Sequence, residues 1–200
     1  MHWGWNHGNW GWLQHEPAML AAIVLWCLFS IYWEKEATRA SAAAVRESHV
    51  SRWFHLALIN VGQLLLFIQV RGLSGRFLPA PAVFQALGLA LVAAGVALAV
   101  WARRCLGREW SGNITIKVEH KLIRTGPYAR VRHPIYTGLL AMYAGTALVS
   151  GEWHALVGLV LAVLAYWRKV RLEEANLLRG FGAEYAAYRS ETKALIPGVF

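Results

Sequence analysis

Long apolar stretches, separated by short polar ones, dominate the pattern of this chain. A helix that crosses the hydrocarbon core of a bilayer needs about 20 apolar residues, within a range of about 17–25. The pattern predicts five such helices, at residues 17–33, 53–70, 81–102, 134–149 and 153 to about 169. The fourth is short, and the fifth continues into a charged helix that ends near Arg179. We therefore expect an all-α integral membrane protein.

The fourth and fifth predicted helices should form a hairpin, because only Ser150, Gly151 and Glu152 separate them. Residues 1–102 then form a three-span membrane region. Residues 103–200 form a C-terminal region of loop, hairpin and terminal helix, and the two regions together make one domain. Small residues in the third span, including Gly88 and Gly95, allow close helix packing within the chain or between protomers.

Composition supports a lipid-facing chain. Hydrophobic residues make up 57% of the sequence and charged residues 16%, whereas a soluble domain carries about 25% charged residues. A net charge of +9 suggests nucleic acid as one partner, but the basic residues lie between apolar runs, which is the membrane pattern. We expect contacts with membrane lipids and none with nucleic acid. Two isolated cysteines make neither a disulfide framework nor a metal site.

The basic residues also predict the orientation, because cytoplasmic loops are enriched in Lys and Arg. Residues 1–16 contain no Lys or Arg, and residues 71–80 contain two. The other eighteen lie in 34–52, in 103–133 and in the tail from Arg168. Five spans with the N-terminus outside place these eighteen in the cytoplasm, and the short chain suggests a bacterial inner membrane. The opening stretch MHWGWNHGNWGW supplies interfacial tryptophans rather than a metal site.

Candidate chemistry begins in the segment 101–136, which is rich in Gly, His, Tyr and Arg. Gly126-Pro127 marks a turn, and Pro134 suits the first turn of a helix. A helix start offers unpaired N–H groups and the positive end of a dipole, so it is able to receive a carboxylate. His133 and Tyr136 lie near that end and can present polar groups to a ligand.

A second candidate is the charged run RKVRLEE, from Arg168 to Glu174, where the fifth span leaves the membrane. One interpretation is a solvated helix end with a Lys169–Glu173 pair one turn apart. Ionisable groups at membrane depth, however, tend to face a cavity or a partner. The hairpin can bring Glu173 close to the turn before His133, where its carboxylate is able to bind a ribose hydroxyl or an amino group.

Two sequence blocks carry a family resemblance. HKLIRTGPYARVRHPIYTG, followed by EEANLLRGFGAEYAAYR, resembles the isoprenylcysteine carboxyl methyltransferase family and its bacterial relatives. The preceding LGREW and the spacing between the blocks also agree, and the resemblance covers roughly residues 97–197. It implies a membrane methyltransferase that uses S-adenosylmethionine.

The resemblance also implies site residues. It assigns to the cofactor pocket Asn113, His120, Lys121, Leu122, Ile123, Tyr128, His133, Pro134, Ile135, Tyr136 and Glu173. Eukaryotic members of the family use an Arg for the acceptor carboxylate at the position where this chain has Lys169. Arg168 and Arg171 lie close enough to take that role instead, so all three are candidates.

The expected reaction is carboxyl O-methylation of a lipid-like acceptor of the isoprenylcysteine type. A carboxylate is already ionised at neutral pH, so the site must orient it with a cation rather than deprotonate it. N-methylation of a phospholipid amine or S-methylation of a small thiol are alternatives, and they need a base such as His133 or Glu173. No obligate protein partner is expected.

Two further alternatives belong to other classes of protein. Sterol-type membrane reductases share a His-Pro-x-Tyr block and bind a nicotinamide cofactor such as NADPH. They usually have Asn after the Pro and an acid shortly after the following Gly, where this chain has Ile135 and Leu139. A non-catalytic membrane scaffold is the other alternative, and the polar groups gathered at one membrane face argue against it.

Overall fold

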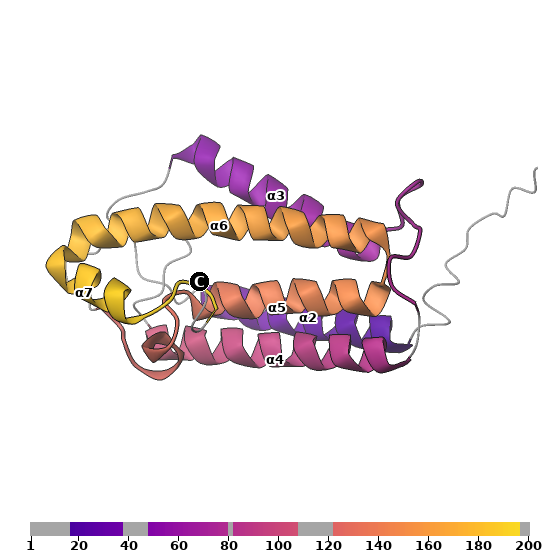
Figure 1. Cartoon of the computed structure of the whole chain (residues 1–200), viewed down its shortest axis with the longest axis horizontal. Coiled ribbons are helices and arrows are strands. Elements are labelled where there is room, and N and C mark those ends of the chain that lie inside the picture. Colours follow the sequence, from indigo (N-terminus) through magenta and orange to yellow (C-terminus); the bar gives the residue numbers. More distant parts are fainter. Residues whose placement is uncertain (1–16, 38–47, 80–81, 108–121, 197–200) are drawn as a thin grey trace, which may run out of the picture.

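The computed structural model describes residues 17–37, 48–79, 82–107 and 122–196, and regular structure in these residues is helical (Figure 1). The helices are α2 (Pro17–Ala37), α3 (His49–Phe67), α4 (Ala82–Leu106), the 3₁₀ helix η2 (Gly126–Ala129), α5 (Pro134–Ser150), α6 (Trp153–Phe181) and α7 (Ala183–Glu191). Asn113, His120, Lys121 and the Trp/His-rich stretch at 1–16 lie outside the described residues.

Each predicted apolar stretch corresponds to a helix, which confirms the all-α class for the described part of the chain. The helix bounds differ by a few residues, since α2 and α4 continue past their apolar stretches as far as Ala37 and Leu106. By length and composition, α2, α3 and α4 can each cross a membrane. The five-span topology stays a prediction, because α5 has only 17 residues and α6 carries charges in its second half.

Figure 1 shows long helices lying side by side, with α4 along α5 and α6 along α3. One end of the bundle holds the ends of α2, α4 and α6 and the starts of α3 and α5. Arg103 stabilises this end, because its guanidinium donates to the carbonyl oxygens of Glu36 at 2.9 Å and Gly107 at 2.8 Å. These bonds satisfy backbone acceptors at the ends of two helices and join α4 to α2.

Paired glycines hold α4 and α5 in backbone contact. A Cβ added to Gly95 would lie 2.5 Å from the carbonyl oxygen of Gly138, and one added to Gly145 would lie 2.5 Å from that of Gly88. The two glycines on each helix are seven residues apart, so they share one helix face. Gly88 and Gly95 therefore pack within the chain, as one of the two sequence-based alternatives expected.

The hairpin between α5 and α6 turns at Gly151, whose φ of 65° is the left-handed conformation that glycine adopts most easily. The two helices of the hairpin contact each other, as predicted, although α5 packs more extensively against α4 and α6 against α3. Gly62 and Gly158 make the α3–α6 contact close, since a Cβ on Gly158 would lie 2.5 Å from the Gly62 carbonyl oxygen.

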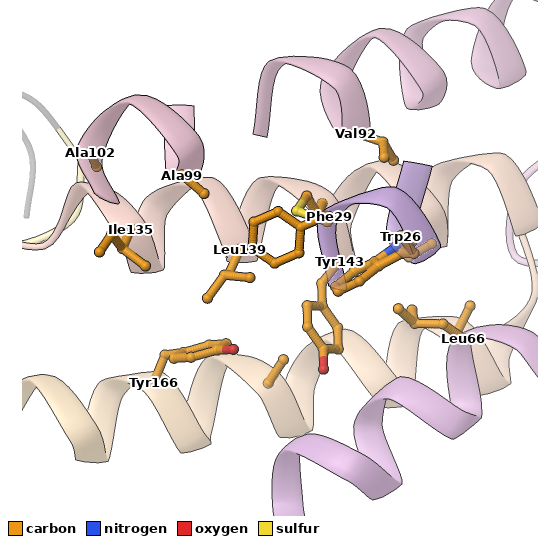
Figure 2. Close-up of a cluster of buried hydrophobic side chains, with 14 of the residues drawn as sticks. Trp26, Phe29, Leu66, Val92, Ala99, Ala102, Ile135, Leu139, Tyr143 and Tyr166 are labelled. Carbon is orange, nitrogen blue, oxygen red and sulfur yellow. The ribbon is translucent and has the colours of Figure 1, made fainter. Parts of the chain in front are cut away.

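Aromatic side chains fill the interior between these helix pairs (Figure 2). Trp26 of α2 donates a 3.0 Å hydrogen bond from Nε1 to the Thr146 hydroxyl of α5, and its ring contacts Tyr143 edge to face at 5.2 Å. Tyr143 in turn donates from its hydroxyl to the carbonyl oxygen of Ile59 on α3 at 3.1 Å. These bonds join three helices through polar atoms that burial would otherwise leave unpaired.

Replacing Gly138 with alanine should destabilise the protein, because the added methyl group collides with the backbone of Gly95. Overpacking of this kind costs about 1–3 kcal/mol. We expect a clearly lower apparent melting temperature for Gly138→Ala in detergent. Gly75→Ala is the matched control, since its Cβ would meet its nearest atom, on Trp153, at an ordinary 3.6 Å. Equal melting temperatures for the two variants would contradict the close contact.

Candidate active site

Three segments meet at the end of the bundle where α5 begins: the start of α5, the charged second half of α6, and α7 with the residues that follow it. Gly126 has a φ of 62° and opens the turn of η2, as the Gly-Pro pair predicted. Pro134 occupies the first turn of α5, and His133 is its N-cap residue. This local sequence directs the chain from the loop into α5 beside α6.

Glu173 of α6 and Tyr136 of α5 form the closest polar contact between the two predicted site segments. The Tyr136 hydroxyl donates a 2.5 Å hydrogen bond to Glu173 Oε1, and His133 Nδ1 lies 3.5 Å from Glu173 Oε2. The His133 and Tyr136 rings are stacked, with centroids 5.7 Å apart. The structure thus brings together three residues from the two predicted site segments, and the Glu173 side chain keeps 22% of its surface exposed.

The pKa values of His133 and Glu173 depend on the contacts that the two side chains make with each other and with their neighbours. Burial acts to lower the pKa of His133, but hydrogen bonding and the negative charges of Glu173 and Glu174 outweigh it, so the pKa is raised. Burial acts to raise the pKa of Glu173, but His133, Tyr136 and the nearby charge of Lys169 lower it on balance. At neutral pH we therefore expect an ionised Glu173, whose contact favours the protonated form of His133.

Glu174 has a different set of contacts from its neighbour. Its Oε1 accepts from both Nε and Nη2 of Arg132 at 2.7 Å and lies 3.5 Å from His133 Nε2, and both side chains of the Arg132–Glu174 pair are less than a tenth exposed. Burial alone would raise the pKa of Glu174, but His133 and Arg132 lower it to about 2. The Arg132–Glu174 ion pair therefore attaches the chain just before α5 to α6.

The residues after α7 complete this arrangement, and we refer to 192–195 as the C-terminal strap. Arg132 Nη1 donates to the carbonyl oxygens of Arg189 and Thr192. The backbone N–H groups of Arg132 and His133 donate to the carbonyl oxygens at positions 193 and 194, at 2.9 and 3.0 Å. The strap thus pairs the two N–H groups immediately before α5, and ligand binding by the first turn of α5 itself stays a prediction.

The structure separates the three cations predicted to orient the acceptor. Lys169 is 6% exposed and lies on α6 one turn before Glu173, whose pKa it lowers. Arg168 faces α3 instead, where its Nη2 donates to the Ser51 hydroxyl at 2.5 Å and its guanidinium stacks on the Phe54 ring at 5.4 Å. Arg171 is exposed. Lys169 alone of the three is buried beside the acid.

The other predicted pocket residues in the described part of the chain are buried or half-buried. Tyr128, Pro134 and Ile135 are buried, and Leu122 and Ile123 are half-buried. Burial, followed by the charge of Glu173, raises the pKa of Tyr128.

Sequence reasoning did not assign a role to Glu174 and missed the C-terminal strap. The acid directly after Glu173 carried a signal, because adjacent residues on a helix lie about 100° apart and can both face one side. The strap offered no such signal, since its bonds to the start of α5 are made by backbone carbonyl oxygens.

These features define a helical membrane protein with a polar site at one end, built from a His-Pro-x-Tyr helix start and paired acids. The model of the phospholipid methyltransferase family matches residues 83–184, which is just over half of the chain. The chain belongs to this family.

Curated relatives extend the comparison. The protein-S-isoprenylcysteine O-methyltransferase of Schizosaccharomyces pombe is 31% identical over 121 residues, covering 58% of this chain and 50% of that protein. The enzyme of the same name from Saccharomyces cerevisiae is 32% identical, covering 56% and 48%. Methanethiol S-methyltransferase 1 of Bradyrhizobium diazoefficiens is 37% identical over 71 residues, covering 35% and 24%. The chain spans about half the length of the first two relatives.

A solved structure shares the fold. The eukaryotic intramembrane Ras methyltransferase, an isoprenylcysteine carboxyl methyltransferase, matches with a TM-score of 0.55 at 20% identity. The match covers 76% of this chain and 55% of that one. The resemblance on which the site residues were predicted is thereby confirmed at the level of family and fold. This chain is an integral membrane protein, and its methyltransferase relatives imply a methyl donor.

Replacing Glu174 with glutamine should weaken the attachment of the start of α5 to α6, because Arg132 would stay buried without a countercharge. Breaking a buried ion pair costs about 3 kcal/mol or more, so we expect a lower apparent melting temperature at pH 7. Since the pKa of Glu174 is about 2 rather than 4.5, this stabilisation should be lost as the pH falls from about 4.5 towards 2. The variant should therefore approach the wild type in acid.

Glu191→Gln is the matched control. Glu191 also pairs with an arginine, Arg124, at 2.5 Å, but the two side chains are 63% and 38% exposed. An exposed pair contributes less than about 1 kcal/mol. If both glutamine variants melted like the wild type at pH 7, the Arg132–Glu174 pair would not stabilise the site.

Proposed function

We propose that the protein is a membrane methyltransferase that uses S-adenosylmethionine and methylates the carboxylate of a lipid-like acceptor. Family membership supports methyl transfer over the nicotinamide reductase and scaffold alternatives. The observation that carries the proposal is the Tyr136–Glu173 contact beside His133, because it joins the two sequence blocks on which the resemblance rests.

The residues present fit the donor. S-adenosylmethionine, when bound, supplies a methyl group carried on a positively charged sulfur. Glu173 is ionised at neutral pH and partly exposed, so its carboxylate suits hydroxyl groups or an ammonium group. Tyr128 is buried and the charge of Glu173 acts on it, and half-buried Ile123 adds an apolar side chain. In the proposed pocket these residues, with His133, Pro134, Ile135 and Leu122, hold the donor, and Asn113, His120 and Lys121 extend it.

The acceptor is proposed to be a carboxylate oriented by Lys169. A carboxylate nucleophile needs alignment and partial removal of water, and alignment alone supplies about 7–11 kcal/mol. The Lys169 ammonium is buried on the face of α6 that carries Glu173, so it can orient an anion there. Arg168 is held by α3 and Arg171 is exposed, which argues against both.

Amine or thiol acceptors fit this site less well, although one relative is named for a thiol acceptor. Both need a base to take up a proton. The contact between His133 and the acids raises the pKa of His133 and lowers that of Glu173. The contact therefore favours the protonated form of the histidine, and it makes the carboxylate a weaker base. A carboxylate acceptor is already ionised at neutral pH and needs no base.

The proposed topology has five spans with the N-terminus outside and the site in the cytoplasm of a bacterium. The alternating direction of α2 to α6 in Figure 1 and the basic residues at one end support it. In this arrangement the polar donor enters from the cytoplasm and the acceptor from the bilayer, between helices. Residues 1–102 and 103–200 act as one domain in the inner membrane.

Glu173→Gln should weaken donor binding by about 10- to 100-fold, because a charge-assisted contact contributes about 1.5–3 kcal/mol. Tyr136→Phe should have a smaller effect of the same sign, since it removes the hydroxyl that donates to Glu173. Calorimetry with S-adenosylmethionine in detergent measures both. Glu191→Gln is again the control. Unchanged affinity in both site variants would show that Glu173 and Tyr136 do not bind the donor.

Lys169→Met should lower methyl transfer to carboxylate acceptors at least tenfold while leaving donor affinity near that of the wild type. Removing a buried cation that pairs with an anion costs more than losing an exposed one. The measurement is a product screen with labelled S-adenosylmethionine against lipid acids, phospholipid amines and thiols. Arg171→Met is the matched control on the exposed face of α6. Methylated amines or thiols as the main products would contradict the carboxylate assignment.

A further inference from the structure

Two neighbouring arginines, Arg52 and Arg168, have no acidic partner among the residues that the structure describes. Arg168 of α6 donates to the hydroxyl and carbonyl oxygens of Ser51 on α3 at 2.5 and 3.4 Å, and its guanidinium lies over the Phe54 ring at 5.4 Å. Arg52 is exposed and directly follows Ser51, so its Cα lies about 3.8 Å from that of the serine. Two positive charges therefore lie close together, and the described residues supply no countercharge.

The level of these arginines in the bilayer follows from the packing of α3 against α6. The glycine contact between the two helices lies later in α3 and earlier in α6 than the contact of Ser51 with Arg168, so the helices are antiparallel. Trp53 is therefore level with Trp167, and both side chains are exposed. Tryptophans are enriched where the hydrocarbon core meets the lipid headgroups. Arg52 and Arg168 each adjoin one of these tryptophans in the sequence, which puts them at headgroup level.

Apolar surface continues from these arginines towards the middle of the bilayer. Leu164 lies one turn of α6 before Arg168, and Val61 lies two turns of α3 after Phe54, so each pair shares a helix face. Leu164, Val61 and Phe54 are all exposed. A molecule that contacts both arginines therefore meets apolar side chains on its bilayer side. This combination suits an amphiphile with an anionic head rather than a soluble anion.

We propose that Arg52 and Arg168 bind the phosphate of an anionic phospholipid, whose acyl chains lie along the exposed apolar side chains of α3 and α6. A guanidinium suits phosphate because it presents several donors in one plane, and such charge-assisted bonds are strong. The headgroup must be anionic as a whole, since a zwitterionic one carries a cation that cancels the charge of its phosphate. The bound lipid joins the start of α3 to α6.

The proposed lipid site is separate from the candidate active site. Arg168 and Glu173 are five residues apart on α6, which places their side chains about 140° apart around the helix. Arg168 contacts α3, whereas Glu173 contacts α5. The inference therefore goes beyond the proposed methyl transfer and does not depend on it. It gives a role to an arginine of the charged run that the acceptor site does not use.

The test measures lipid binding to the full chain in detergent by native mass spectrometry, with dioctanoyl phosphatidylglycerol and dioctanoyl phosphatidylcholine as probes. The wild type should bind phosphatidylglycerol about 25-fold more tightly, because each arginine near an anionic headgroup contributes about fivefold. Arg168→Gln and Arg52→Gln should each lower this preference about fivefold. Arg52 is exposed and has no side-chain bond within the described residues, so its variant tests the site even if Arg168→Gln fails to fold.

Arg104→Gln is the matched control. Arg104 is also exposed and follows the exposed Trp101 by three residues, but it belongs to α4, which lies on the opposite side of the bundle from α3 (Figure 1). This variant should keep the preference for phosphatidylglycerol. A wild type without that preference would show arginines that are merely solvated and would overturn the site. An equal loss in Arg104→Gln would also overturn it, since binding would then reflect overall charge.

Inorganic phosphate separates a lipid site from a site for the free anion. At the same concentration as phosphatidylglycerol, it should leave the bound lipid in place, because it cannot contact the apolar side chains of α3 and α6. Displacement of the lipid by phosphate would overturn the assignment to a phospholipid.

Discussion

The close approach of α4 and α5 is the contact on which the rest of the structure depends. Gly88, Gly95, Gly138 and Gly145 allow two backbones to touch, so α5 has little freedom to slide or rotate against α4. That contact determines where α5 begins relative to α6. A site that requires a 2.5 Å hydrogen bond between Tyr136 and Glu173 depends on such rigid placement, since neither helix carries the site alone.

The paired acids of α6 divide two tasks between them. Glu173 keeps part of its surface exposed and contacts Tyr136, which suits a residue that meets a ligand. Glu174 is buried against Arg132, and this ion pair stabilises the fold. Between them stands His133, 3.5 Å from an oxygen of each, so its charge depends on both.

Much of the fold could be predicted because apolar length and helix-opening residues are local signals. Pro134 and Trp153 begin helices where the sequence indicated. Packing partners could not be predicted, because the adjacency of α5 and α6 in the chain says nothing of how well their faces fit. At the site, motif residues were predictable by resemblance. The roles of Lys169 and Arg168 became distinct only when the helix faces were known, since one faces the acid and the other faces α3.

The C-terminal strap has a consequence for how the protein is made. Arg132 and the strap residue that accepts its N–H bond are about sixty positions apart, and both helices of the hairpin lie between them. Because a chain emerges from the ribosome N-terminus first, α5 and α6 are synthesised before the strap exists. During that interval the start of α5 lacks its backbone partners. The site is therefore among the last parts of the molecule to take shape.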